Sequence, residues 1–456
     1  MTSGAAAAIA GAGDTIVAEA TVTGRGALAV IRLSGPRAHE VARSVCEAWP
    51  DAPRLALLVD IRDRSGGRID QAIVIRYDGP ASYTGEDAVE FTTHGGVTVP
   101  ATVVAALIES GARLALPGEF TRRAVLNGKL DLLQAEAVGD LVSASSRAAQ
   151  RLALDQLDGG LSRRLLALRS DLLGLEALIA YDIDFPEEDD GPIPAERIAA
   201  AMRTLLASLD ALLATAEAGD LVREGALVVL AGVPNAGKSS LFNALIGRRR
   251  AIVTDVPGTT RDAIEAVVDI GRWPLRLVDT AGLRETADKV ERLGVEVSYE
   301  YLARAVVVLV CGATDDEIDL ARAACTSRST SPIVIARTKA DLRPSTGDTG
   351  DASIDVSALT GAGIEALLER ISRTLDDVVE VDADAPVLTR ARHRERVTAA
   401  RSELLAFQEA WTTRKVPAIV AAVHLRTATG ALEELIGRID VETILDEVFA
   451  RFCVGK

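Results

Sequence analysis

The pattern of apolar and polar positions divides the chain into three kinds of segment. Up to about residue 127, the short β-rich runs TIVAEATV, ALAVIRLSG, QAIVIRY and AVEFTTHGG accompany the helical stretch VPATVVAALIESGA, which predicts an α+β domain. From about Leu130 to Leu221, Leu and Ala recur at three- and four-residue intervals, which predicts amphipathic helices. Strands and helices alternate over 224–378, and helical patterns return from about Pro386.

A helical region that is interrupted by an α/β region indicates an inserted domain. The apolar stripe of an isolated helix needs a partner, so we expect the two helical pieces to pack into one bundle. The sequence therefore predicts a multidomain α+β fold with an inserted α/β domain. The expected parts are a disordered leader, 1–13; an N-terminal α+β domain, 14–127; a discontinuous helical domain, 128–223 and 379–456; and an α/β domain, 224–378.

Composition narrows the class of protein. A hydrophobic content of 48% with 25% charged residues is ordinary for a globular protein, and no apolar run approaches the length of a membrane span, about 20 residues. Four scattered cysteines favour a reducing, cytoplasmic setting without structural zinc. The net charge of −16 disfavours non-specific coating of nucleic acid. The arginines of 248–250 and 390–396 are either local basic patches or solvated faces.

Residues 232–239, GVPNAGKS, are the most informative motif in the chain. They fit Gly-x-x-x-x-Gly-Lys-Ser, and they lie between an apolar strand, ALVVLAG, and a short amphipathic helix, SLFNALIG. A turn from strand to helix points backbone N–H groups and the positive helix end at phosphate oxygens. Lys238 is then expected to reach the β- and γ-phosphates, and Ser239 to hold Mg²⁺.

Three further motifs follow in order along the α/β region. AIVTDVPGTTRD, 251–262, supplies a mobile-loop threonine for magnesium, and PLRLVDTAG ends a strand at Asp279. PIVIARTKAD places Asp341 where a carboxylate accepts from guanine N1–H and the exocyclic amine, which selects GTP. The residues expected to contact the nucleotide or its ions are Asn235, Ala236, Gly237, Lys238, Ser239, Ser240, Thr254, Asp255, Val256, Pro257, Gly258, Thr259, Thr260, Asp279, Thr280, Ala281, Gly282, Thr338, Lys339, Asp341, Ser357 and Ala358.

The sequence offers two candidates for the group that assists hydrolysis. Leu283 follows DTAG, where many small GTPases carry a water-orienting Gln, so another group must act. Asn235 could help to bind a monovalent cation together with carbonyls of the 254–259 loop. Glu291 could orient water through a second water. The alternative is that it is an ordinary charged residue on a solvated helix face.

With these residues in place, the chain closely resembles the bacterial tRNA modification GTPase family MnmE, also called TrmE. The resemblance covers essentially everything after Asp14. It depends on GVPNAGKSSLFNAL, AIVTDVPGTTRD and DTAGLRETADKVERLG in the α/β region, and on GRGALAVIRLSG, SYTGEDAVEFTTHGG and PGEFTRRAVLNGKLDLLQAEA before it. The ending FCVGK, 452–456, matches the family's Cys-x-Gly-Lys terminus.

The resemblance implies a potassium-stimulated GTPase that acts as a homodimer. It implies an N-terminal domain for tetrahydrofolate binding and dimerisation, and a flavoprotein partner, MnmG. Together they install a carboxymethylaminomethyl-type group at C5 of a wobble uridine in tRNA, with a one-carbon unit from 5-formyl- or 5,10-methylene-tetrahydrofolate. Catalytic roles fall to Glu291, Asn235 and Cys453; potassium contacts to Asn235, Thr254, Val256 and Thr259; magnesium contacts to Ser239 and Thr260; and folate contacts to Arg32, Glu90, Lys129 and Lys456.

Two departures from the family pattern carry expectations of their own. Thr338 replaces an Asn, so the chain lacks an amide that braces the loop and contacts the base, and weaker GTP binding is expected. Pro257 stiffens the cation loop, with either sign of effect on the site. Cys453 is either reactive or a helix-end thiol. The alternatives to tRNA modification are a GTP-dependent assembly or ribosome-associated switch, and a folate-dependent one-carbon transferase regulated by GTP.

Overall fold

The computed structural model of the protein describes residues 13–184, 194–248, 264–279, 300–343, 353–379, 386–413, 417–437 and 455. The chain forms two compact units, which are described separately below. The first comprises Met1–Gly139 with Glu433–Lys456, and the second comprises Asp140–Leu432. The predicted fold class is confirmed: an α+β N-terminal part, a discontinuous helical part and an α/β part between its two pieces. The individual domain boundaries stay predictions.

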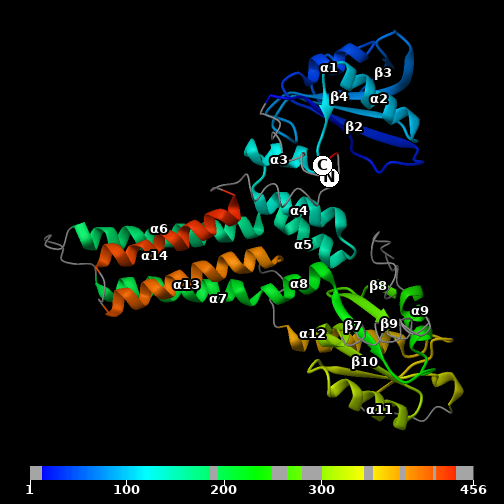
Figure 1. The fold of residues 1–456 in the computed structure, drawn as a ribbon, viewed down its shortest axis with the longest axis vertical. Helices are drawn as coiled ribbons and strands as arrows, with labels where there is room; N and C mark the ends of the chain where they lie inside the picture. Colours follow the sequence, from blue (N-terminus) through cyan, green and yellow to red (C-terminus); the bar gives the residue numbers. More distant parts are fainter. Residues whose placement is uncertain are drawn as a thin grey trace, which may run out of the picture. The chain divides into compact units, whose positions relative to one another are not determined.

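The first unit contains a six-stranded sheet in the order β3-β4-β5-β2-β1-β6, antiparallel except for the β1–β6 pair. Two helices, α1 and α2, cover one face of this sheet (Figure 1), and the alternate strand residues that face them form its core. The bounds are β1 Ile16–Glu19, β2 Leu28–Ser34, α1 Ala38–Val45, β3 Leu57–Arg62, β4 Arg68–Tyr77, β5 Ala88–His94, α2 Thr98–Glu109, β6 Arg113–Leu114 and α3 Glu119–Leu126.

The strands β1, β2, β4 and β5 and the helix α2 lie where the hydrophobic pattern predicts them. Four elements of the first unit were not predicted: α1, β3, α3 and the two-residue β6. Both α1 and β3 carry a signal in the sequence. Buried positions in α1 recur at Ala38, Val41, Ala42 and Val45, the spacing of one helix face. The buried residues of β3 alternate with more exposed ones, as expected of a strand with one covered face.

The second sheet has the order β12-β11-β10-β7-β9-β8 and is parallel except for the β8–β9 hairpin. Both faces are covered, so the strands are nearly continuous apolar runs, and every residue of β7 and β10 is buried. One face packs against α8 (Ala216–Glu224), α9 and α12, and the other against α11. The bounds are β7 Ala226–Ala231, α9 Lys238–Arg248, β8 Ile264–Asp269, β9 Pro274–Asp279, β10 Val307–Gly312, α11 Asp315–Thr326, β11 Ile333–Arg337, β12 Ile354–Asp355 and α12 Ile364–Val378.

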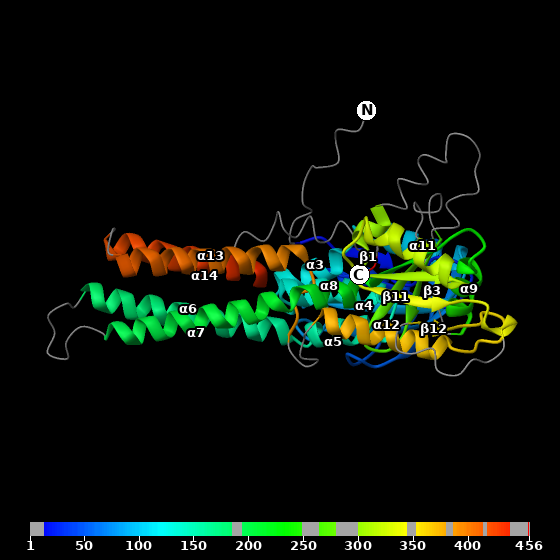
Figure 2. The same ribbon diagram turned by 90° about the horizontal axis from the view of Figure 1, so that it is seen from below.

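Four long helices from the two helical pieces, α6, α7, α13 and α14, run side by side in both views (Figures 1 and 2). Ion pairs link them: Arg401 of α13 with Asp210 of α7, and Arg426 of α14 with Glu176 of α6. The predicted bundle is thus confirmed. The stretch 132–157, which has helical spacing throughout, forms two helices, and Ser146 caps the second. The bounds are α4 Leu132–Ser143, α5 Arg147–Leu157, α6 Gly160–Asp184, α7 Ala195–Ala214, α8 Ala216–Glu224, α13 Ala391–Thr413 and α14 Ala418–Ile436.

Within the second unit, hydrogen bonds between side chains and backbone groups join the α/β part to the helical part. The chain segment that leaves the α/β part is held by two polar side chains: Gln156 donates to the Val387 carbonyl at 3.2 Å, and the Thr215 hydroxyl accepts from Leu388 N–H at 3.1 Å. At the β8–β9 turn, Asp269 accepts from Arg147 N–H, the first amide of α5, at 3.0 Å. These contacts anchor the inserted domain at both its exit and its hairpin.

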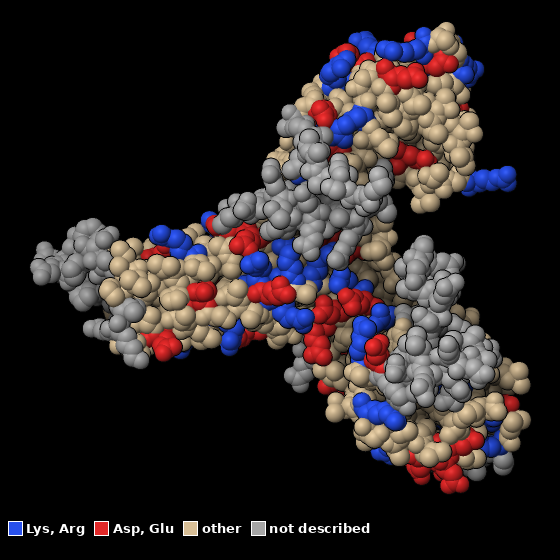
Figure 3. All heavy atoms as spheres, in the orientation of Figure 1, with Lys and Arg blue, Asp and Glu red and all other residues tan. Residues whose placement is uncertain are grey.

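Among the described residues, the stretch Glu196–Glu224 has the length and mean hydropathy of a membrane span. This is weak support for a membrane segment, because a core helix of a helical domain satisfies the same test. Two of the four arginines in 390–396 form ion pairs: Arg390 with Asp140 and Arg394 with Asp220. Basic and acidic atoms are interleaved over the face drawn in Figure 3, which favours a solvated face over a nucleic-acid patch.

Candidate functional site

The phosphate loop connects the end of β7 to the start of α9, as predicted. Lys238, the first residue of α9, is buried, and its ammonium donates to the carbonyls of Gly232 and Val233, each at 2.9 Å. Asn235 has a positive φ of 64°, a left-handed conformation that few residues other than glycine adopt readily. A side chain at position 232 would lie 2.3 Å from the Cys311 carbonyl of β10, so only glycine fits there. The loop therefore curls around the lysine ammonium.

Thr338 still braces the phosphate loop, and the weaker GTP binding that is expected at this position stays a prediction. The amide of the usual Asn is absent, but the brace to the phosphate loop is not: the buried Thr338 hydroxyl donates to the Ala236 carbonyl at 2.7 Å. Thr338 N–H in turn donates to the Gly312 carbonyl at the end of β10. The threonine thus connects the predicted guanine-binding motif, residues 338–341 (the guanine motif), to the phosphate loop.

Replacing Thr338 by Val should weaken GTP binding by about tenfold. Valine keeps the shape but cannot donate, so the Ala236 carbonyl loses its buried partner at a cost of about 1–3 kcal/mol. Calorimetric titration with GDP measures the effect, and Thr338→Ser, which keeps the hydroxyl, is the control. Equal affinity of the valine variant and the natural protein would show that the brace has no bearing on nucleotide binding.

The guanine motif and the following loop lie together. Ser357, which is buried, donates from its hydroxyl to Asp341 at 2.6 Å, and Ala340 N–H donates to the Val356 carbonyl at 3.1 Å. Lys339 has a positive φ of 56°, so the chain turns sharply just before Asp341. Asp341 is exposed at the rim of this turn. Its carboxylate is therefore fixed on one side and accessible to a base on the other.

Asp279 is placed next to the phosphate loop by the sheet. It ends β9, it pairs in register with Leu230 of β7, and it is buried. Ser239 and Ser240 are exposed in the first turn of α9, and hydroxyl and carboxylate oxygens suit Mg²⁺. Burial raises the pKa of the neighbouring Cys311 thiol to about 12, so that thiol stays protonated. Within the described ranges, no group of three metal-ligating side chains is preassembled.

Several predicted site residues lie outside the described residues. They are Thr254, Asp255, Val256, Pro257, Gly258, Thr259, Thr260, Thr280, Ala281, Gly282, Glu291, Cys453 and Lys456. The structure brings together the other predicted nucleotide residues, in the phosphate loop, at the end of β9 and in the two guanine loops.

A second site lies on the face of the first sheet that α1 and α2 leave uncovered. It is a pocket of about 170 Å³, smaller than the 300–1,000 Å³ typical of whole-ligand sites, so it suits one ring system of a larger ligand. The lining residues are Arg32, Ser34, Tyr77, Tyr83, Thr84, Ala88 and Glu90.

Sheet register assembles the polar centre of this pocket. Arg32 of β2 is the direct partner of Glu90 on β5, and two guanidinium nitrogens donate to one carboxylate oxygen at 3.0 and 2.9 Å. The other oxygen accepts from the Tyr77 hydroxyl at 3.2 Å. Burial and the Glu90 charge raise the pKa of Tyr77, which keeps it a donor. The Arg32 guanidinium lies 5.1 Å from the centre of the Tyr83 ring.

Only some of the predicted folate residues lie together in the structure. Arg32 and Glu90 line the pocket, whereas Lys129 donates to the Pro80 carbonyl at 3.1 Å, on the loop 78–87 that carries Tyr83. Near the C-terminus, Gly455 is packed so closely against the end of β1 that a Cβ would lie 2.5 Å from the Glu19 carbonyl. Neither Tyr77 nor Tyr83 was among the site residues predicted from the sequence. The available signal was their rarity, because two of only five tyrosines in the chain fall within residues 77–83.

Comparisons with known proteins agree with this arrangement. Residues 15–129 match the family model described as GTP-binding protein TrmE N-terminus, and residues 132–453 match the MnmE helical domain. A tRNA modification GTPase MnmE from Azoarcus sp. (strain BH72) is 42% identical over 97% of this chain and 98% of its own, and one from Caulobacter vibrioides (strain ATCC 19089 / CIP 103742 / CB 15) is 42% identical over 97% and 100%.

A solved structure, the G domain of the T. maritima FeoB iron transporter, covers 33% of this chain and 98% of its own at 25% identity, with a TM-score of 0.26. A TM-score this low supports no conclusion about the fold. The helical-domain match spans more than half of the chain, and the identity to the two relatives extends over nearly all of it. This chain therefore belongs to the MnmE family of tRNA modification GTPases.

Proposed function

We propose that this GTP hydrolase modifies tRNA. In the proposal it works with the flavoprotein MnmG to add a carboxymethylaminomethyl-type group to C5 of a wobble uridine, using a one-carbon unit from tetrahydrofolate. The observation that carries the proposal is the presence, in one chain, of a braced phosphate loop and of a separate pocket built on an Arg32–Glu90 pair. A GTP-dependent switch in assembly or on the ribosome needs only the first of these.

The chemistry of the pocket suits a pterin ring. A carboxylate has about four acceptor positions, and Arg32 and Tyr77 use only some of those on Glu90, so N–H donors of a pterin can be accepted as well. Tyr83 offers an aromatic face beside them. The glutamyl carboxylate of a folate would suit the cations of Lys129 and Lys456, the second of which lies outside the described residues.

The proposed assembly is a homodimer. The uncovered sheet face carries a row of paired positions across four strands: Leu58 opposite Ile73, Ile73 opposite Thr92, and Thr92 opposite Val30. Leu58 is 60% exposed and Ile73 is 41% exposed, and apolar side chains in such a row favour burial against another surface. A second copy of this domain is the proposed partner, and juxtaposed α/β domains would then promote hydrolysis.

GTP hydrolysis by this chain should be faster in potassium than in sodium, by about 10–100-fold. A cation beside the β- and γ-phosphates would stabilise the negative charge that develops in the transition state, and one such group is worth this much or more. The predicted ligands are Asn235 and the 254–259 loop. Phosphate release at equal ionic strength measures the rate in each salt.

The matched control for the cation site lies on the neighbouring helix. Asn235→Ala should lower the potassium rate to the sodium rate, whereas Asn243→Ala, which alters an exposed residue of α9, should leave the potassium stimulation intact. Equal rates of the unmodified protein in potassium and sodium would contradict the proposed cation site.

A further inference from the structure

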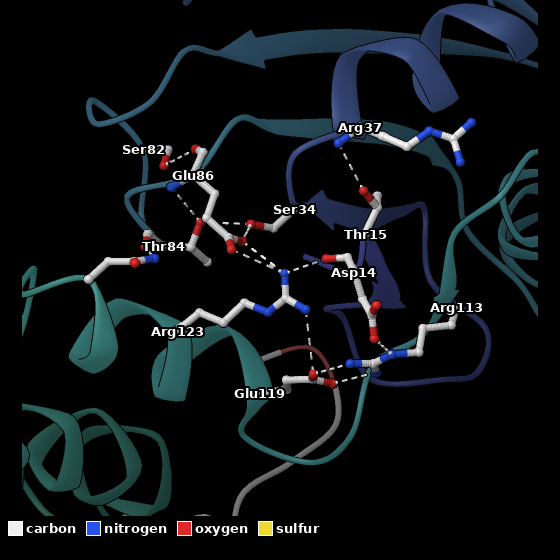
Figure 4. Close-up of polar contacts among 11 residues, drawn as sticks. Asp14, Thr15, Ser34, Arg37, Ser82, Thr84, Glu86, Arg113, Glu119 and Arg123 are labelled. Carbon is white, nitrogen blue, oxygen red and sulfur yellow. Dashed lines mark hydrogen bonds and ion pairs between the residues drawn. The ribbon is translucent and has the colours of Figure 1, made fainter. Parts of the chain in front are cut away.

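A network of buried and partly buried charges contacts Ser34 and Thr84, two of the residues that line the pocket of the N-terminal sheet (Figure 4). Its centre is the ion pair between Arg123 of α3 and Glu86 of the 78–87 loop, with Nη1 3.0 Å from Oε2. The Arg123 side chain is only 9% exposed, and the same Nη1 donates to the Asp14 carbonyl at 2.7 Å. Buried charges must be paired, so this guanidinium fixes the position of the Glu86 carboxylate.

Glu86 in turn orients the side chains of two residues that line the pocket. The Ser34 hydroxyl donates to Glu86 Oε2 at 2.8 Å, and it lies 2.7 Å from the Thr84 hydroxyl. Because the proton of Ser34 is committed to the carboxylate, Thr84 must donate to Ser34 in that contact. The hydroxyls of Ser34 and Thr84, both of which line the pocket, are thereby held in single orientations.

Residues 121–127, in α3 and at its C-terminal end, also hold the segment that carries Tyr83, an aromatic residue that lines the pocket. The Tyr83 hydroxyl lies 2.9 Å from the buried Thr121 hydroxyl, and Asn127 donates to the Thr84 carbonyl at 2.7 Å. Segment 83–86 is therefore held from behind by three side chains of 121–127.

We propose that Arg123 and Glu86 are positioning residues for the ligand of this pocket. Neither reaches the ligand. They keep Tyr83, Thr84 and Ser34 in the geometry that receives it, so that binding does not have to include the cost of ordering the loop. The inference extends the proposed function, because it takes the ligand to be a tetrahydrofolate.

The network contains its own matched control, Arg113. This arginine donates to Glu119 at 2.5 and 2.9 Å and to Asp14 at 3.0 Å, and the hydrogen bonds to Glu119 raise its pKa. It belongs to the same cluster as Arg123, since Glu119 also lies 3.6 Å from Arg123 Nη2. None of its partners lines the pocket. Arg113 and Arg123 thus share a structural role but differ in their connection to the ligand.

The experiment compares Arg123→Lys with Arg113→Lys in the full-length protein. Lysine keeps the charge but loses the fork that spans two partners, so both variants should unfold at a lower temperature. Calorimetric titration with 5-formyl-tetrahydrofolate should give a Kd about tenfold higher for Arg123→Lys, a change of about 1.4 kcal/mol, and within about twofold of the natural value for Arg113→Lys. GTP hydrolysis should be unchanged in both.

Two further variants keep the test decisive if Arg123→Lys folds poorly. Ser34→Ala removes the hydroxyl between Glu86 and Thr84 without disturbing the Arg123–Glu86 ion pair, and it should also raise the Kd. Glu86→Gln leaves the buried Arg123 without its counter-charge, and it should raise the Kd as well. Equal loss of affinity in Arg113→Lys and Arg123→Lys would show a purely structural role and would overturn the inference. Failure of the natural protein to bind the folate, with GTP hydrolysis intact, would instead overturn the proposed pocket ligand and the inference with it.

Discussion

Replacing Asp341 by Asn should lower the affinity for GTP by about 10³-fold and create affinity for xanthosine triphosphate. The carboxylate is expected to accept from two guanine donors, and an amide that presents N–H groups to the same edge leaves donors facing donors. Xanthine carries a carbonyl where guanine has its amine, so the variant should prefer it. The fold should survive, because an Asn oxygen can still accept from the Ser357 hydroxyl that holds Asp341 at 2.6 Å.

Competition between GTP and xanthosine triphosphate for a fluorescent nucleotide measures this change of base preference. Asp319→Asn is the matched control, since Asp319 is an exposed residue of α11. Unchanged preference for GTP in Asp341→Asn would mean that the loop of 338–341 does not read the base. That result would not bear on the assignment of the phosphate loop, so the base-binding and phosphate-binding halves of the site are tested separately.

Replacing Lys238 by Ala should reduce GTP hydrolysis by about 10²–10³-fold. The ammonium is the cation that the phosphate loop encloses, at 2.9 Å from the carbonyls of Gly232 and Val233. Without it, the negative charge of the transferred phosphoryl group has no fixed counter-charge within the loop. Single-turnover phosphate release measures the loss. Arg322→Ala, on the exposed side of α11, should hydrolyse GTP normally. A hydrolysis rate for Lys238→Ala within tenfold of the natural rate would contradict the assignment of the loop.

Much of the fold could be predicted because each element carries its own periodicity. The apolar runs of β7 and β10 are buried on both faces, and the alternation in β2 and β5 marks sheet strands with one covered face. The nucleotide motifs were predictable for a related reason: each is a local turn with fixed residue requirements. The missed elements of the first unit, α1, β3, α3 and β6, are short, and short segments give weak periodic signals.

The second pocket could be predicted only in part. Arg32 and Glu90 came from resemblance, but Ser34, Tyr77 and Tyr83 join them through strand register and a folded loop. Those are tertiary relations that no local pattern encodes. Thr338 is a second case of a tertiary contact that the local sequence does not predict. The sequence predicts a lost amide, whereas the contact that replaces it depends on how closely the guanine motif approaches Ala236.

The most direct test of the central claim is nucleoside analysis of tRNA from a strain that lacks this gene and carries it back in two forms. If the chain is a tRNA-modifying GTPase, the C5 substituent of the wobble uridine should be absent from the deletion strain. It should return with the natural gene, and remain absent with Lys238→Ala expressed at the same level. Wobble uridines that keep the full substituent in the deletion strain would contradict the account.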